Sequence, residues 1–250
     1  MFTPSTTTRR ATLSAAAILS ALSFGMADAQ ASTVGRIFGP DLNEFSNDRV
    51  IYHGSNLQDD LKITKSGLNI TFEDPNQVIT PTDASCVSIN AHKVRCDSKE
   101  GFAEGQIEGV QAYLDQGDDE ALVLASDGIS VLVDGEEGDD ELTSGDARHS
   151  LLGGDGEDTL LGNGGNDLLQ GNAGPDHIVP GAGEDEVYGG PAADTIEAKD
   201  GQVDDIDCGS GLDTFSADAS DVKSGCELAN GFQQLDPPAP PAPQDPPAGE

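Results

Sequence analysis

The chain has 250 residues, with 46 acidic side chains against 12 basic ones and a formal net charge of −34 at pH 7. Glycine occurs 31 times, tryptophan is absent and aromatic residues make up 4%. Because like charges repel, this acidity makes DNA, RNA and anionic lipid poor partners. Hard cations that prefer oxygen ligands are the expected counterpart. A disordered acidic chain is the alternative that composition alone leaves open.

The N-terminus, residues 1–29, has the pattern of a secretory signal peptide. Arg9 and Arg10 precede an apolar stretch at residues 15–24, and Ala27-Asp28-Ala29 has the form of a cleavage site. The stretch is about half as long as the ~20 apolar residues that a membrane span needs. We therefore expect a secreted protein without a membrane span, by either the Sec or the Tat route.

All four cysteines lie beyond this segment, and three pairings are open to them. We expect the two local disulfides, Cys86–Cys96 and Cys208–Cys226, because each closes a short loop. An oxidising compartment favours disulfides over thiolate chemistry. Zinc binding is the alternative, and the sequence contains no CxxC motif in its support.

A period of nine residues organises the stretch from Gly135 to Glu197. The seven blocks read GEEGDDELT, SGDARHSLL, GGDGEDTLL, GNGGNDLLQ, GNAGPDHIV, PGAGEDEVY and GGPAADTIE. The sixth position is aspartate except at His149, and the fourth is glycine except at Ala147 and Ala192. The eighth position is aliphatic in every block: Leu142, Leu151, Leu160, Leu169, Ile178, Val187 and Ile196. A disordered chain does not keep three such columns in phase.

One apolar residue in nine suits a very short strand and not an amphipathic helix, which needs three or four in two turns. Two blocks then form one coil of a flattened right-handed solenoid, with coils stacked about 4.8 Å apart. The aspartates of successive coils would lie in columns and repel each other unless a cation separates them. Carboxylate and carbonyl oxygens at flexible spacing favour calcium over magnesium, whereas zinc and copper would need His or Cys ligands.

The block GGDGEDTLL resembles the GGxGxDxUx nonapeptide of the hemolysin-type (RTX) calcium-binding repeats. The resemblance implies a parallel β-roll in which aspartate carboxylates and turn carbonyls bind several calcium ions between blocks two apart. The fold class expected is therefore all-β: a β-roll, or β-solenoid, over residues 126–226, with a β-rich capping region at residues 30–125. This protein departs from the large RTX toxins in carrying an N-terminal signal, which argues against a toxin-like role.

The register extends to two further blocks, KDGQVDDID and CGSGLDTFS, if Ala198 is skipped. Alternate blocks then place their aspartates on two edges, and His149 interrupts the second edge. Blocks with Ala192 or Gln202 in place of a turn glycine should form weaker sites. The candidate calcium ligands are Asp140, Asp158, Asp176, Asp194 and Asp213 on one edge, and Asp167, Asp185 and Asp204 on the other.

Residues 30–125 contain short β-prone runs between turn residues. These runs are Val50–Tyr52, Leu61–Thr64, Leu68–Phe72, Cys86–Ile89 and Val110–Leu114. We expect them to stack onto the N-terminal end of the roll, and an independent small β-domain is the alternative. Between Cys208 and Cys226 the register is lost, because Val222 falls in the aspartate column. Residues 227–250 form a Pro-rich tail that is expected to be extended and unpacked.

A search for catalytic groups finds neither an HExxH motif, nor a GxSxG elbow, nor a Walker loop. The sequence therefore predicts a secreted calcium-binding β-roll that serves as a binding or structural module and not as an enzyme. An extracellular polysaccharide-active hydrolase with structural calcium is the alternative, and convergent acids in a cleft of the N-terminal region would favour it. An adhesin would differ from the module only in having an extracellular or cell-surface partner.

Overall fold

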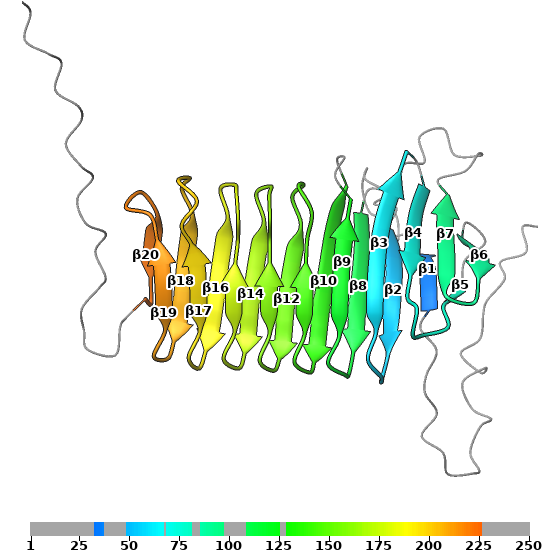
Figure 1. The fold of residues 1–250 in the computed structure, drawn as a ribbon, viewed down its shortest axis with the longest axis horizontal. Coiled ribbons are helices and arrows are strands. Elements are labelled where there is room, and N and C mark those ends of the chain that lie inside the picture. Colours follow the sequence, from blue (N-terminus) through cyan, green and yellow to red (C-terminus); the bar gives the residue numbers. More distant parts are fainter. Residues whose placement is uncertain are drawn as a thin grey trace, which may run out of the picture.

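The computed structural model describes residues 33–37, 49–67, 69–81, 86–97, 109–125 and 129–226. These residues form twenty strands in two sheets of ten, stacked along one long axis (Figure 1). Among them, no helix is long and apolar enough to cross a membrane. The expected signal peptide and the Pro-rich tail lie outside the described residues.

The first sheet has the strand order β20-β18-β16-β14-β12-β10-β8-β2-β1-β5. Its strands are β1 (Thr33–Ile37), β2 (Arg49–Ser55), β5 (Thr80–Pro81), β8 (Gly109–Asp115), β10 (Ser130–Glu137), β12 (Ser150–Asp155), β14 (Leu168–Ala173), β16 (Glu186–Pro191), β18 (Asp205–Ser210) and β20 (Val222–Ser224).

The second sheet has the order β19-β17-β15-β13-β11-β9-β3-β4-β7-β6. Its strands are β3 (Asp60–Ser66), β4 (Asn69–Glu73), β6 (Cys86–Asn90), β7 (Lys93–Asp97), β9 (Glu120–Leu124), β11 (Glu141–Thr143), β13 (Thr159–Leu161), β15 (His177–Val179), β17 (Thr195–Ala198) and β19 (Thr214–Ala217).

The repeats form a parallel β-solenoid in which two blocks make one coil, as the sequence predicted. Leu151 pairs with Leu169 in the first sheet and Leu160 pairs with Ile178 in the second, each eighteen residues along the chain. The offset grows by one residue at the C-terminal end, where Ile196 pairs with Phe215. Ala198 itself remains in β17, so the turn that follows it absorbs the extra residue.

The core is a single file of apolar side chains between the two sheets. All nine eighth-position residues are buried, and Phe215, the last of them, is the most exposed at 8%. Full burial of one such side chain is worth about 1.5–3 kcal/mol. Each of the strands β11 to β19 contributes one of these side chains, so the core is thin along the repeats.

The N-terminal strands extend the same two sheets. All five β-prone runs form strands, namely β2, β3, β4, β6 and β8. β2 pairs with β8 and β3 with β9 in parallel, which continues the solenoid, whereas β4, β6 and β7 add antiparallel strands beyond β3. The expectation that this region stacks onto the end of the roll is confirmed.

Both expected disulfides are present. Cys86 and Cys96 join β6 to β7, with Cα atoms 4.0 Å apart, and Cys208 and Cys226 join neighbouring coils, with Cα atoms 4.9 Å apart. The described residues contain no free cysteine. Two closed disulfides fit an oxidising compartment.

The two alanines at the fourth position of a block differ in backbone conformation. Ala192 has φ +101°, in the region that disfavours any residue with a Cβ, whereas Ala147 has no positive φ. The turn at Ala147 therefore does not need glycine, contrary to what the block pattern suggests.

The replacement Ala192→Gly is expected to raise the free energy of unfolding by about 1 kcal/mol, because it relieves this backbone strain. The matched replacement Ala147→Gly should lower it by a similar amount, because it only adds freedom to the unfolded chain. Thermal unfolding of both variants in calcium would check this. Equal effects of the two replacements would contradict the difference between the turns.

Candidate metal site

All eight predicted aspartates lie in turns that connect the two sheets, in two columns along the edges of the solenoid. The first column occupies the turns from the first sheet to the second, and the second column occupies the return turns. Each of the eight side chains is at most 3% exposed. The structure therefore brings together the residues that the sequence assigned to each edge.

Each column is a ladder of hydrogen bonds between coils. The Asp140 N–H donates to Oδ1 of Asp158 at 2.9 Å, and the Asp158 N–H donates to Oδ1 of Asp176 at 3.0 Å. The backbone carbonyl of Asp140 accepts from the N–H of Thr159 at 2.7 Å. The same pattern continues through Asp194. The backbone groups and Oδ1 of a column aspartate are thus used in binding neighbouring coils.

The second carboxylate oxygen has no partner. Oδ2 is buried without a hydrogen bond in nine aspartates: Asp119, Asp140, Asp158, Asp167, Asp176, Asp185, Asp194, Asp204 and Asp213. A buried acceptor without a donor typically costs about 1–3 kcal/mol, and more when it is charged. Nine such atoms in two columns form a set of acceptors that a shared cation would satisfy.

The pKa values of the buried aspartates in the cation-free form also favour a cation partner. Burial, together with the neighbouring carboxylate of Asp158, raises the pKa of Asp140 to about 7. Burial also raises the pKa of Asp167 and Asp176 to about 7 and that of Asp158 and Asp204 to about 6. Without a cation, these groups hold protons at a pH where exposed aspartates are fully ionised.

A glycine at the first position of the block makes room for four carboxylates of the first column, those of Asp140, Asp158, Asp176 and Asp194. A Cβ on Gly153 would lie 2.2 Å from Oδ2 of Asp158 and 2.7 Å from the carbonyl oxygen of Gly171. The same two kinds of oxygen converge over Gly135, Gly171 and Gly189. We call this space, between an Oδ2 atom and the carbonyl of the next coil, the glycine cradle.

The donor set suits a hard cation. Among the described residues, no three His, Cys, Asp or Glu side chains converge on one point. A metal ion here must therefore take part of its coordination from backbone carbonyls, as calcium does in proteins. The absence of nitrogen and sulfur from the cradles disfavours zinc and copper.

The second column offers fewer cradles. Gly162 has the carbonyl of Pro180 at 2.1 Å and Oδ2 of Asp167 at 3.1 Å from its would-be Cβ. Ser144 and Pro180, however, stand at the first position of their blocks and are buried there. Their side chains take up the space that glycine leaves open on the other edge, so the two edges are not equivalent.

His149 takes the place of an aspartate in the second column, as predicted, and forms the N-terminal end of that column. Its N–H donates to Oδ1 of Asp167 at 2.7 Å, like that of a column aspartate. The ring is buried: Nδ1 accepts the N–H of Val131 at 3.2 Å, so Nε2 carries the proton and donates to the carbonyl of Ala125 at 3.1 Å. Burial lowers the pKa of His149, which keeps the ring neutral. The imidazole thus satisfies both of its polar atoms without a metal.

Three column members were missed in the sequence. The prediction that Val222 enters the aspartate column is wrong: Asp221 takes that place and accepts the Asp204 N–H at 3.2 Å, because the preceding turn is one residue shorter. The first column also continues through Asp119 and Asp59, whose N–H groups donate to Asp140 and Asp119 respectively. Gly54, Asp59 and Leu61, spaced as positions one, six and eight, are the signal that could have revealed this extra coil.

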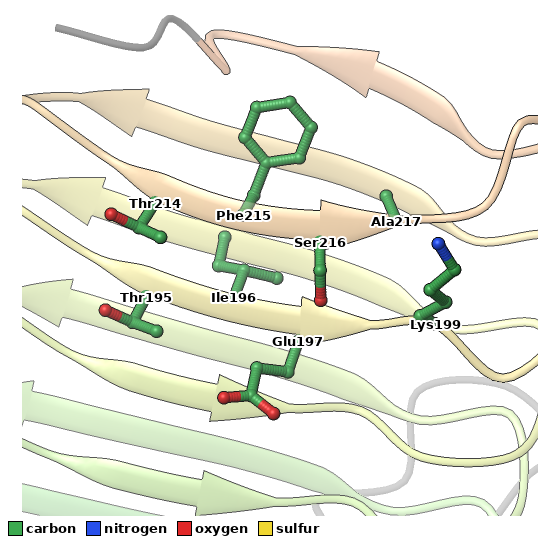
Figure 2. Close-up of a pocket in the computed structure, with 8 residues that line it drawn as sticks. All are labelled: Thr195, Ile196, Glu197, Lys199, Thr214, Phe215, Ser216 and Ala217. Carbon is green, nitrogen blue, oxygen red and sulfur yellow. The ribbon is translucent and has the colours of Figure 1, made fainter. Parts of the chain in front are cut away.

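Two shallow hollows lie outside the columns. One, of about 260 Å³, is lined by β17, β19 and Lys199, and its charged lining residues are Glu197 and Lys199 (Figure 2). The other, on β3, β4 and β9, includes Asp60, Glu73 and Glu120. Glu73 is paired with Lys93 at 2.6 Å, and Asp60 accepts from Asn76 at 2.6 Å. Neither hollow presents a nucleophile and base in contact.

Comparison with known families identifies the repeats. A family model of the RTX calcium-binding nonapeptide repeat, comprising four copies, matches residues 152–187 and 170–202. Residues 152–202 carry RTX calcium-binding repeats. The recognition made from GGDGEDTLL is confirmed, and the parallel β-solenoid of the described residues is consistent with an RTX β-roll. No curated protein and no solved structure matches the chain.

The glycine cradle of the RTX repeats can be tested with matched glycines. In Gly171→Ala the new methyl group would lie 2.2 Å from Oδ2 of Asp176 and 2.6 Å from the Gly189 carbonyl, which forces the carboxylate aside. We expect a loss of about 1–3 kcal/mol in unfolding free energy.

The control is Gly164→Ala, whose methyl group would meet nothing closer than 3.5 Å. It should cost less than 1 kcal/mol, because Gly164 has no positive φ. Chemical denaturation in calcium measures both. A Gly171→Ala protein as stable as the Gly164→Ala protein would contradict the assignment of the cradle.

Proposed function

We propose that this chain is a secreted calcium-binding β-roll whose folding depends on calcium and which serves as a binding or structural module. The observation that carries the proposal is the set of nine buried, unpartnered Oδ2 atoms. Five of them, on Asp140, Asp158, Asp167, Asp176 and Asp194, face backbone carbonyls across glycine cradles, and no protein donor satisfies any of the nine. One calcium ion between two consecutive coils would neutralise the carboxylates and use those carbonyls.

The proposed ligands are the eight column aspartates, and they are not equal. Asp140, Asp158, Asp176 and Asp194 each have a complete cradle, and Asp167 has one in the second column. Asp213 has Cys208 at its first position instead of glycine, and Asp185 has Pro180. We therefore assign the strongest sites to the four first-column aspartates that have a cradle. We assign weaker sites to Asp185, Asp204 and Asp213.

Calcium would supply stability that the thin core lacks. Two ionised carboxylates about 5 Å apart repel by about 3 kcal/mol at an effective dielectric constant of 20. An ion that binds only the folded form contributes about 2.7 kcal/mol per site at a hundredfold excess over its dissociation constant. The combined contribution of several such ions exceeds the unfolding free energy of a typical domain, about 5–15 kcal/mol. Removal of the ions should therefore unfold the roll.

The surface around the N-terminal hollow supports a binding or structural module better than it supports a hydrolase. The acids that gather in the N-terminal hollow, Asp60, Glu73 and Glu120, are the feature that would favour an enzyme. Two of them are already engaged with Asn76 and Lys93, and the hollow is open. The disulfides and the signal-like segment at residues 1–29 support secretion, and an adhesin is this same module with a surface partner.

Calcium titration of the mature chain tests the proposal. After EDTA treatment the protein should lose most of its β-type circular dichroism, and calcium should restore it at about 10⁻⁴–10⁻³ M, the range of extracellular sites. Asp158→Asn should raise the calcium midpoint, because it removes a column ligand. Asp155→Asn, which removes the same charge from an exposed side chain, should leave the midpoint unchanged. An EDTA-treated protein that stays fully folded would refute calcium-dependent folding.

The raised pKa values predict opposite pH dependences with and without calcium. In EDTA the folded state binds more protons than the unfolded state between pH 4 and 7, since the folded pKa values of about 6 to 7 exceed 3.8. Stability in EDTA should therefore rise as the pH falls from 8 to 5. In saturating calcium it should fall over the same range, because protons displace the ion. If stability changed with pH in the same direction in EDTA and in saturating calcium, protons and calcium would not share a site.

A further inference from the structure

The two ends of the solenoid differ in how their edge strands are protected. At the N-terminal end, the edge strand β5 contains Pro81, and the edge strand β6 has a bulge between Ser88 and Asn90. Proline and bulges are two of the devices that keep a sheet edge from pairing with another strand. At the C-terminal end, β19 has neither device, and its four residues are uncharged. The C-terminal edge of the second sheet is therefore open to one more strand.

The last aspartate of the first column lacks the backbone partners that earlier ones have. The carbonyl of Asp194 accepts the N–H of Thr214 at 2.7 Å, and the N–H of Asp194 donates to Oδ1 of Asp213 at 3.1 Å. Within the described residues, nothing donates to the carbonyl of Asp213, and its own N–H has no acceptor. Both groups of Asp213 are thus left for a following coil.

The end of β19 presents a further open donor. Ala217 holds the place that Gly162 holds three coils earlier, one residue after the paired outward residues. Gly162 donates its N–H to the carbonyl of Val179, in the following coil, at 2.9 Å. The N–H of Ala217 therefore points away from β17, toward the place where a next strand would lie.

The last coil also carries the most exposed apolar side chains. Among the described residues, Leu212 and Val222 lead the large hydrophobic side chains in exposure, at 67% and 58%. Phe215 ends the file between the two sheets, beyond Ile196 of β17 (Figure 2). An apolar surface at an open edge of a sheet fits an added strand that brings apolar side chains of its own.

The chain contains such a segment directly after the last coil. Residues 228–235, which lie outside the described residues, read LANGFQQL and carry no charge in a chain with a net charge of −34. Cys226 is fixed in the last coil by its disulfide to Cys208. β19 begins six residues after Cys208, and Phe232 lies six residues after Cys226. Pro237 follows, and a proline does not continue a strand ladder.

A tethered segment is a better occupant than a second copy of the chain. A short tether gives a segment an effective concentration of about millimolar, without the need for a second molecule. A second copy would bring its own acidic last coil, with Asp205 and Asp218, against the same acids here. Like charges oppose that contact.

We propose that residues 228–235 add a strand to β19 and close the C-terminal end of the second sheet over Phe215. The strand would bind the carbonyl of Asp213 and the N–H of Ala217. The inference goes beyond the proposed function, and it does not require calcium in any particular site. The segment after it, residues 236–250, remains the tail that the sequence predicts to be unpacked.

Hydrogen exchange at the Ala217 amide, in saturating calcium, tests the proposal. The mature chain and a chain ending at Leu235 should both protect this amide. A chain ending at Glu227 should exchange it at least tenfold faster, while the amide of Gly162, inside the solenoid, stays protected in all three. An Ala217 amide that is unprotected in the mature chain, or equally protected in all three proteins, would overturn the inference.

A substitution repeats the test in the full-length chain. Phe232→Asp should accelerate exchange at Ala217 at least tenfold, because it places a charge in the closing strand. Ala239→Asp adds the same charge beyond the segment and should change nothing. Sedimentation velocity identifies the competing occupant. Protection of Ala217 that appears only with dimer formation, and is lost on dilution, would assign the edge to a second copy and overturn the inference.

Discussion

The whole architecture depends on burying carboxylates one above another at the spacing of β-strands. A parallel solenoid repeats every coil at about 4.8 Å, so any side chain in the repeat is stacked on its own copies. Aliphatic residues benefit from this stacking, and aspartates do not unless something positive lies between them. The structure nevertheless uses Oδ1 of each aspartate to bind the preceding coil, as in the pair Asp140 and Asp158. The same residue thus builds the ladder and creates the need for a cation.

The two ends of the second column are closed by groups that need no cation. His149 begins the second column with a neutral ring whose two nitrogens bind backbone groups. Asp221 ends the second column, and its Oδ2 accepts the N–H of Asp218. The Oδ2 atoms of Asp185 and Asp204, by contrast, have no hydrogen bond. In the first column Cys208 replaces the glycine, and its disulfide to Cys226 joins the last two coils covalently. His149 and Asp221 thus take the place of the ion at the two ends of the second column, whereas Oδ2 of Asp213, in the last block of the first column, has no partner.

Much of this arrangement could be predicted from the period of nine. Because strand pairing needs equal spacing, the repeated aliphatic position determined the register, and with it the two columns. The Cys208–Cys226 pairing was expected for a different reason, because it closes a short loop. Asp221 was missed because its turn is one residue shorter, and no local pattern marks such a change. Asp59 was missed because the inserted strands β4 to β7 separate its coil from the next, and Asp119 was missed because it lies 21 residues before Asp140 instead of 18. The sequence did not predict that the second column has fewer glycine cradles than the first. That difference depends on the direction in which the Cβ atoms of Ser144 and Pro180 point, and only the folded coil determines this direction.

The most direct test of the central claim, that calcium lies between stacked aspartates of consecutive coils, is a crystal structure of the mature protein grown in calcium, with anomalous difference maps. The account predicts a row of peaks along the first column, one beside each cradle of Gly135, Gly153, Gly171 and Gly189, within 2.3–2.6 Å of the aspartate Oδ2 atoms. Ordered columns with no anomalous peaks, or peaks confined to exposed acids such as Asp155, would contradict it.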